Sequence, residues 1–167
     1  MSTRQIDLDP DASGSDDRIP TEGITVRELR QGDLDRLVKI DSHATGQERR
    51  GYYEQRLKTA LEESGIRVSL AAEVDGTLVG FVIGRVYHGE YGRTESYATI
   101  DTIGVSPRFR HRGIGHALLT QLRRNLGALR IERVQTEVEW DDWELLRFLQ
   151  HVGFRPAPRL ALEMPLE

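Results

Sequence analysis

A basic turn, with the strand and helix predicted on either side of it, constrains the fold of this chain more than any other feature. Residues 99–105 are rich in β-branched side chains, and the basic turn follows at residues 106–112. From there Ile114, Leu118 and Leu122 recur every four residues, which is the spacing of one face of a helix. The stretch therefore predicts a strand, a sharp turn and a helix in immediate succession.

The turn and the helix start together predict a binding site for an anion. The residues concerned are Arg108, Arg110, His111, Arg112, Gly113 and Gly115. A helix start leaves backbone N–H groups without partners, and the helix dipole favours negative charge there. Glycines let a phosphate approach the main chain, and arginines supply forked donors that match phosphate oxygens.

The formal net charge of −4 belongs to one end of the chain. The first 22 residues hold six acidic side chains and two basic ones, which leaves 21 of each sign in residues 23–167. We therefore expect residues 1–22 to form a disordered acidic tail and residues 23–167 to fold as one nearly neutral domain. Nucleic-acid binding driven by overall charge gains no support, so no nucleic-acid partner is expected.

Composition excludes several kinds of site. The chain has no cysteine, hence no disulfide, thiolate nucleophile or cysteine metal site. Its five histidines show no metal-ligand spacing, so no metal is predicted. No apolar run reaches transmembrane length and no signal peptide is evident, which predicts a cytoplasmic protein without a membrane partner.

The remaining sequence predicts a mixed α+β domain. Strands are expected over residues 24–29, 68–74, 78–86, 99–105, 133–138 and 159–164. Helices are expected over residues 33–40, 52–61, 113–127 and 143–151. Asp75 and Gly76 join two of the strands as a tight hairpin, and the helix after the basic turn makes the crossover.

Several kinds of anion site are compatible with a basic turn before a helix. A P-loop is excluded because no Gly-Lys-Ser/Thr follows the glycines. A dinucleotide fingerprint fails because Leu118 occupies the position of its third glycine. A cradle for the pyrophosphate of coenzyme A remains, beside the simpler interpretation of a helix start with solvated arginines.

In the basic turn and the helix start, the sequence resembles the GNAT superfamily of N-acetyltransferases. Arg110, Gly113 and Gly115 match the family's pyrophosphate loop, Arg/Gln-x-x-Gly-x-Gly/Ala. Gly153 and Phe154, after a short predicted helix, resemble the second cofactor-facing segment of the family. The resemblance covers nearly everything after the tail. It implies the GNAT fold, a mixed central sheet flanked by helices.

The resemblance also implies acetyl-CoA as the co-substrate. The main chain from Arg112 to His116 would bind its pyrophosphate, and the end of the preceding strand would pair with pantetheine. Gly104 would form a β-bulge that turns a backbone N–H toward the thioester oxygen. The cofactor-binding residues expected on this basis are Ile103, Gly104, Val105, Arg110, His111, Arg112, Gly113, Ile114, Gly115 and His116.

Direct attack by an amine requires a group that removes its proton. Asp101 is the first candidate base, because strand alternation would place it on one face with Ile103 and Val105. A buried aspartate that caps a neighbouring loop is the alternative. Glu137, with Glu139, is the second choice, although a half-exposed strand shows the same alternation; Glu90 is the third choice.

One position departs from the family pattern. The tyrosine that many members use as the acid for the leaving thiolate corresponds to Leu149, and an asparagine seven residues earlier corresponds to Asp142. We therefore expect the thiolate to leave without that acid, or to take a proton from water. Tyr87, Tyr91 or Tyr97 could replace it in space.

The expected function is N-acetyl transfer from acetyl-CoA to a primary amine of a small molecule or a peptide, by direct attack. Residues 41–53 and 87–95 would build the acceptor side, and their arginines, histidines and tyrosines suit a polar, acid-bearing acceptor. A charged helix face with half-buried tyrosines is the alternative for these residues. The alternative is a GNAT-fold sensor or scaffold that binds acyl-CoA without catalysis. A third is an anion-binding interaction domain unrelated to coenzyme A. A homodimer is also expected.

Overall fold

The computed structural model describes residues 23–63, 68–89 and 94–166. Its strands are β1 (Ile24–Glu28), β2 (Leu70–Val74), β3 (Thr77–Tyr87), β4 (Tyr97–Val105) and β5 (Val134–Thr136). Its α-helices are α1 (Leu34–Thr45), α2 (Arg50–Lys58), α3 (Ile114–Ala128) and α4 (Trp143–His151). The predicted acidic tail lies outside the described residues.

The strands form one mixed sheet in the order β1-β2-β3-β4-β5. Neighbours pair antiparallel except β4 and β5, which are parallel and joined through α3. A parallel pair needs such a crossover, so the position of α3 follows from the topology. The hairpin between β2 and β3 is confirmed, with Asp75 and Gly76 both at positive φ as a tight two-residue turn requires.

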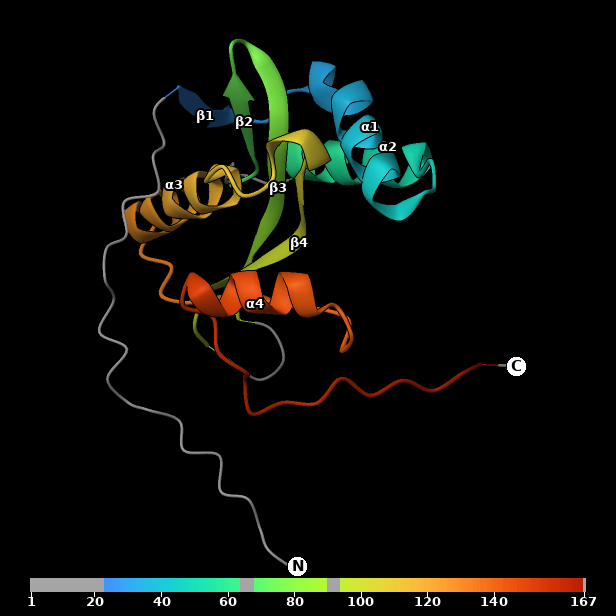
Figure 1. Cartoon of the computed structure of the whole chain (residues 1–167). Helices are drawn as coiled ribbons and strands as arrows, with labels where there is room; N and C mark the ends of the chain where they lie inside the picture. Colours follow the sequence, from blue (N-terminus) through green and yellow to red (C-terminus); the bar gives the residue numbers. More distant parts are fainter. Residues whose placement is uncertain (1–22, 64–67, 90–93, 167) are drawn as a thin grey trace, which may run out of the picture.

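Helices cover both faces of the sheet (Figure 1). On one face α3 and α4 enclose a core that includes Val82, Ile100, Leu118 and Leu149. On the other face α1 and α2 enclose a second hydrophobic core, which includes the Tyr53 side chain. In the part of the chain that the structure describes, no helix has the length and apolar character needed to cross a bilayer.

The pairing of β3 with β4 is irregular at Asp101. Ile83 pairs with Thr102 and Gly84 pairs with Ile100, which leaves Asp101 as the extra residue of a bulge. The bulge predicted at Gly104 is therefore wrong in position, because Gly104 pairs regularly with Phe81. The prediction that Asp101 shares a face with residues 103 and 105 is also wrong, because the extra residue shifts the alternation.

The last predicted strand is not formed. Residues 159–164 have no regular secondary structure and are exposed, and they pair with no strand in the described chain. Four large apolar side chains in this region, Leu160, Leu162, Met164 and Leu166, are 79–89% exposed. The alternation that predicted a strand is present in the sequence, but a partner strand for it is absent from the described residues.

Candidate active site

The parallel strands β4 and β5 separate halfway along β4. They pair only at Ala98↔Val134, Thr99↔Gln135 and Ile100↔Thr136. The Thr136 hydroxyl donates a hydrogen bond to the Ile100 carbonyl oxygen at 3.0 Å and closes this pairing. Beyond it β4 continues to Val105 beside β3 alone, among the described residues. That edge of β4 offers backbone donors and acceptors to an extended ligand.

The N-terminus of α3 lies directly after this open edge and the basic turn. Gly113 has φ 79° and caps the helix without a side chain, and His111 before it has φ 58°. The Ala117 N–H donates to the Gly113 carbonyl oxygen at 2.9 Å, which begins the helical ladder. The N–H groups of residues 114–116 precede that ladder and form the positive end of the helix dipole.

His116 adds a buried polar atom to this helix start. Its Nδ1 is shielded from solvent and has no hydrogen-bond partner in the described part of the chain. Buried polar atoms normally have a partner, so an unpaired one beside free helix N–H groups fits a site that accepts a polar ligand. The unpaired Nδ1 of His116 therefore supports the predicted pyrophosphate position independently of the sequence motif.

The cationic side chains of the turn are exposed and only weakly engaged. Arg110 lies 3.4 Å from the Glu144 carboxylate on α4 and is 38% exposed. The Arg112 guanidinium lies 5.4 Å from the centre of the Phe109 ring. Weak surface contacts of this kind leave both arginines able to turn toward an anion.

Two glycines of the predicted site have a packing role that the sequence analysis did not identify. A Cβ at Gly115 would lie 2.8 Å from Cζ of Phe148, so this glycine lets α4 approach α3. A Cβ at Gly104 would lie 2.8 Å from Cε1 of Phe81 on the neighbouring strand. Both contacts join elements far apart in sequence, and no local pattern could have indicated them.

Asp101 is held on the α2 side of the sheet rather than toward α3. Its carboxylate lies 2.7 Å from Nε of Arg85 and 3.4 Å from Nη1 of Arg56, and its side chain is 11% exposed. Arg85 Nη2 and the Thr99 hydroxyl also donate to it. Burial lowers the pKa of Arg85, but the hydrogen bond and the charge of Asp101 raise it above its ordinary value.

Tyr52 of α2 lies next to this ion cluster. Its hydroxyl is 3.0 Å from the Thr102 hydroxyl. Two cations lie near its ring, with the guanidinium groups of Arg49 and Arg56 at 5.2 Å and 5.1 Å from the ring centre. The sequence placed Tyr52 on the acceptor side but gave it no contact with β4. In a helix, arginines three residues before and four residues after a tyrosine lie on the same side as its ring. This spacing is the sequence signal that could have indicated the contacts of Tyr52 with the two arginines.

Of the tyrosines considered as replacements for the missing acid, Tyr87 and Tyr97 lie away from Gly104. Leu149 is buried in the core between α4 and the sheet. Tyr97 stacks on Tyr87 at the start of β4, and Gly104 is the seventh residue after it along the strand, about 23 Å away. Tyr91 and Glu90 lie outside the described residues. Glu137 and Glu139 are exposed just after β5.

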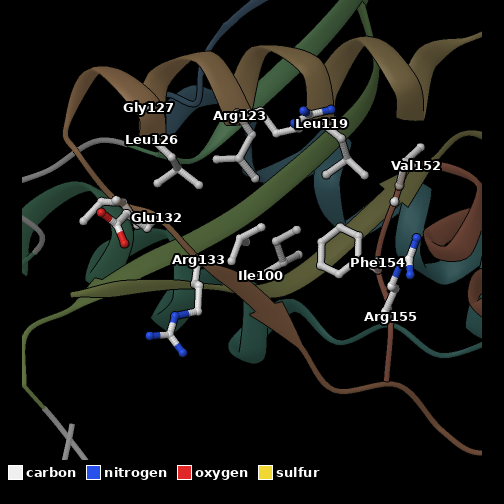
Figure 2. Close-up of a pocket in the computed structure, with 14 residues that line it drawn as sticks. Ile100, Leu119, Arg123, Leu126, Gly127, Glu132, Arg133, Val152, Phe154 and Arg155 are labelled. Carbon is white, nitrogen blue, oxygen red and sulfur yellow. The ribbon is translucent and has the colours of Figure 1, made fainter. Parts of the chain in front are cut away.

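A cavity of about 440 Å³ lies elsewhere, between the C-terminal half of α3, β5 and residues 152–155. Figure 2 shows Leu119, Leu126, Ile100 and Phe154 around it. This cavity does not include the predicted pyrophosphate loop, and it adjoins the outer strand of the sheet.

Comparisons with known proteins bear on this geometry. A family model described as the acetyltransferase (GNAT) family matches residues 29–154. A transcriptional regulator from Bacillus halodurans C-125 superposes with a TM-score of 0.73 at 20% identity, over 86% of this chain and 99% of that chain. The aminoglycoside N-acetyltransferase AAC(6')-Iy in complex with CoA gives 0.72 at 16% identity, over 85% and 94%.

A ribosomal-protein-alanine N-acetyltransferase from Brucella melitensis biovar Abortus 2308 gives a TM-score of 0.66 at 20% identity, over 86% of this chain and 99% of that chain. At these identities the structural matches establish a shared fold. Substrates differ among the matched proteins, so the likeness leaves the acceptor of this chain to be argued from its own residues.

Proposed function

The chain belongs to the acetyltransferase (GNAT) family, and from that premise we propose that it moves the acetyl group of acetyl-CoA to a primary amine by direct attack. Acyl-CoA-dependent N-acetyl transfer is the activity of the family, with acetyl-CoA as co-substrate. The observation that carries the proposal is the open edge of β4, which is followed by the N–H groups that precede the hydrogen-bond ladder of α3.

We place the pyrophosphate on the main chain from Arg112 to His116, with Arg110 and His111 beside it. The buried Nδ1 of His116 supports this placement because a bound phosphate or amide would satisfy it. Pantetheine would extend along residues 103–105, in the place that β5 leaves open. Bound there, acetyl-CoA would supply an activated acyl group, and a backbone N–H of β4 near Gly104 would donate to its carbonyl oxygen.

The proton of the attacking amine has two proposed routes. Asp101 remains a candidate base, but its oxygens already contact Arg85, Arg56 and Thr99. A carboxylate has about four lone-pair sites, so these contacts leave Asp101 better suited to hold the arginines than to reach the amine directly. Glu137 is exposed beyond the end of β5, and it or a water molecule is the second route.

Two arginines share one carboxylate at Asp101, and on this basis we propose an amine that also bears a carboxylate or another acid. Arg56 and Arg85 share the single carboxylate of Asp101, and their side chains are 33% and 31% exposed. One guanidinium therefore retains donors for a substrate acid. The same charge disfavours the ammonium form of a nearby amine, which makes it a better nucleophile.

Matched pairs of acceptors test the proposal. Each pair contains one amine with a free carboxylate and its uncharged amide, and a polycationic aminoglycoside serves as a third class. We expect acetylation of the acid-bearing amine to have a kcat/KM at least about tenfold higher than that of its amide, since a charge-assisted hydrogen bond contributes roughly 1.5–3 kcal/mol. Thiol release measures the rate, and mass spectrometry identifies the N-acetyl product.

The outcomes separate the parts of the proposal. Equal rates for acid and amide would overturn the acceptor class while leaving the transferase intact. A preference for the aminoglycoside would overturn the proposed acceptor class more strongly. Saturable binding of acetyl-CoA without transfer to any amine would favour the sensor or scaffold, which the buried Leu149 at the position of the family acid also supports.

Two further proposals concern the location and the assembly of the protein. A cytoplasmic location is one, and the absence of nucleic-acid and membrane partners belongs with it. A homodimer is the other, and the exposed apolar side chains after α4 support it.

A further inference from the structure

If the proposed function holds, the open edge of β4 determines where the sulfur of a bound coenzyme would lie. Helix α3 begins at Ile114, and the edge runs from Val105 back to Ile100, where β5 is paired. With the pyrophosphate at the start of α3, the pantetheine arm would extend along this edge toward the fork between β4 and β5. Thr102 is the second residue after Ile100, so the reacting end of the arm would lie beside it.

The hydroxyl of Tyr52, on α2, is held at the same point of β4. Its oxygen lies 3.0 Å from Oγ1 of Thr102, and both side chains are half-buried. The Tyr52 ring packs edge-to-face on Tyr53, with ring centres 5.1 Å apart, which orients it without using the hydroxyl. Side chains opposite each other on neighbouring strands have Cβ atoms about 4.5–5.5 Å apart. A ligand group opposite Thr102, on the α2 side of the sheet, would therefore be within reach of the Tyr52 hydroxyl.

The two cations at the Tyr52 ring favour donation of its proton. The guanidinium groups of Arg49 and Arg56 lie 5.2 Å and 5.1 Å from the ring centre. Each is held in place by a carboxylate, Asp41 for Arg49 and Asp101 for Arg56. A cation beside an aromatic ring stabilises the negative charge that remains on the tyrosine after its proton has moved. The same contacts leave the hydroxyl itself free to meet a ligand.

Leu149, at the position of the family acid, has no proton to donate, and we propose that Tyr52 performs that role in this chain. As the amine nitrogen bonds to the acetyl carbon, the C–S bond breaks and its electron pair passes to sulfur, which takes the proton of the Tyr52 hydroxyl. The Thr102 hydroxyl donates a hydrogen bond to the Tyr52 oxygen during this step. The amine passes one proton to Glu137 or to water, and solvent returns one to Tyr52, so protons and charge balance.

Binding of coenzyme A and of desulfo-coenzyme A, in which hydrogen replaces the thiol, tests the contact without turnover. Calorimetry at pH 9 is suitable, because thiols have a pKa of about 8.5 and a large share is ionised there. We expect the wild type to bind coenzyme A at least about tenfold more tightly than the desulfo analogue, since the Tyr52 hydroxyl would donate to a charged sulfur. Tyr52→Phe should bind both with the Kd of the desulfo analogue, within about twofold.

The outcomes separate the role of Tyr52 from the function of the protein. Equal affinity of the wild type for the two molecules, or a preference that persists in Tyr52→Phe, would overturn the role of Tyr52 and leave the transferase intact. Binding of neither molecule would overturn the proposed function and the role of Tyr52 together.

Tyr53→Phe is the matched control on the same helix. Its side chain is 0% exposed, and its hydroxyl is buried without a hydrogen-bond partner in the part of the chain that the structure describes. In steady-state assays with acetyl-CoA, we expect Tyr52→Phe to lower kcat about 10²-fold with little change in KM, and Tyr53→Phe to keep both. A wild-type kcat in Tyr52→Phe, or an equal loss in the two variants, would overturn the proposal.

Discussion

The two faces of β4 meet very different partners. On one face Ile103 and Val105 pack into the core formed with α3, the helix that follows β4 after a turn of eight residues. On the other face Asp101 and Thr102 contact side chains 16 to 50 residues away, from α2 and β3. The first face is specified by a local stretch of sequence, whereas the second exists only once the sheet and α2 have come together.

This difference implies a division of roles. The α3 side, with its free N–H groups and glycines, is suited to hold a coenzyme that many proteins share. The α2 side, with Arg49 and Arg56 both near the Tyr52 ring, is suited to select the acceptor. Variants on one side should change coenzyme affinity, and variants on the other should change turnover.

The largest effect is expected from Gly113→Val on the α3 side. A β-branched residue is strongly disfavoured at φ 79°, so the helix start would shift. Loss of two charge-assisted hydrogen bonds at about 1.5–3 kcal/mol each would weaken acetyl-CoA binding more than about 10²-fold. Calorimetry measures the Kd. An unchanged Kd in a folded variant would remove the helix start from the binding site.

Asp101→Ala should give the next largest effect, and on turnover rather than binding. Removing the carboxylate releases Arg56 and Arg85 together, and it removes a candidate base. We expect kcat to fall about 10²-fold, the low end of general-base contributions, with the Kd for acetyl-CoA unchanged. Asp101→Asn keeps the shape and separates the two roles through its pH profile. Unchanged turnover would exclude Asp101 from both roles.

Gly115→Ala should have a smaller effect because it crowds Phe148 rather than removing a donor. Overpacking of this kind costs about 1–3 kcal/mol, and we expect a matching fall in stability with weaker acetyl-CoA binding. Adding Phe148→Leu should restore both if packing is the cause. Gly127→Ala, whose Cβ would meet nothing within 4 Å, is the control on the same helix. Equal behaviour of the two alanine variants in thermal unfolding would contradict the packing role.

The smallest effect is expected from Glu144→Gln. This carboxylate lies 3.4 Å from Arg110 at an exposed position. Surface ion pairs contribute about 0.2–1 kcal/mol, so freeing Arg110 should tighten acetyl-CoA binding by a few-fold at most. Titration calorimetry at low salt is the most sensitive measurement. Weaker binding in this variant would show that Glu144 itself contacts the ligand.

The contrast between the two faces of β4 also explains which features the sequence could predict. The strand, the basic turn and α3 were predicted because each has a local pattern, and α4 was predicted over residues 143–151 as observed. The hairpin at Asp75 and Gly76 has an equally local cause. The family resemblance, confirmed by the family model, rests on the same stretch.

The failures are tertiary in origin. The bulge lies at Asp101 because of the pairing between β3 and β4, which strand alternation within β4 cannot reveal. Gly104 and Gly115 are needed for contacts with Phe81 and Phe148, each from another element. The strand predicted over residues 159–164 has the right alternation, but pairing needs a second strand as well as a pattern.

The division of roles is tested most directly by two measurements on one preparation of Arg85→Ala, with the wild type beside it. One is the Kd for acetyl-CoA, and the other is kcat/KM for an acid-bearing amine and its amide. The account predicts transfer by the wild type, a Kd within about twofold of wild type in the variant, and loss of roughly tenfold or more in the preference for the acid. A Kd that rises together with the loss of turnover, or an undiminished preference for the acid, would contradict it.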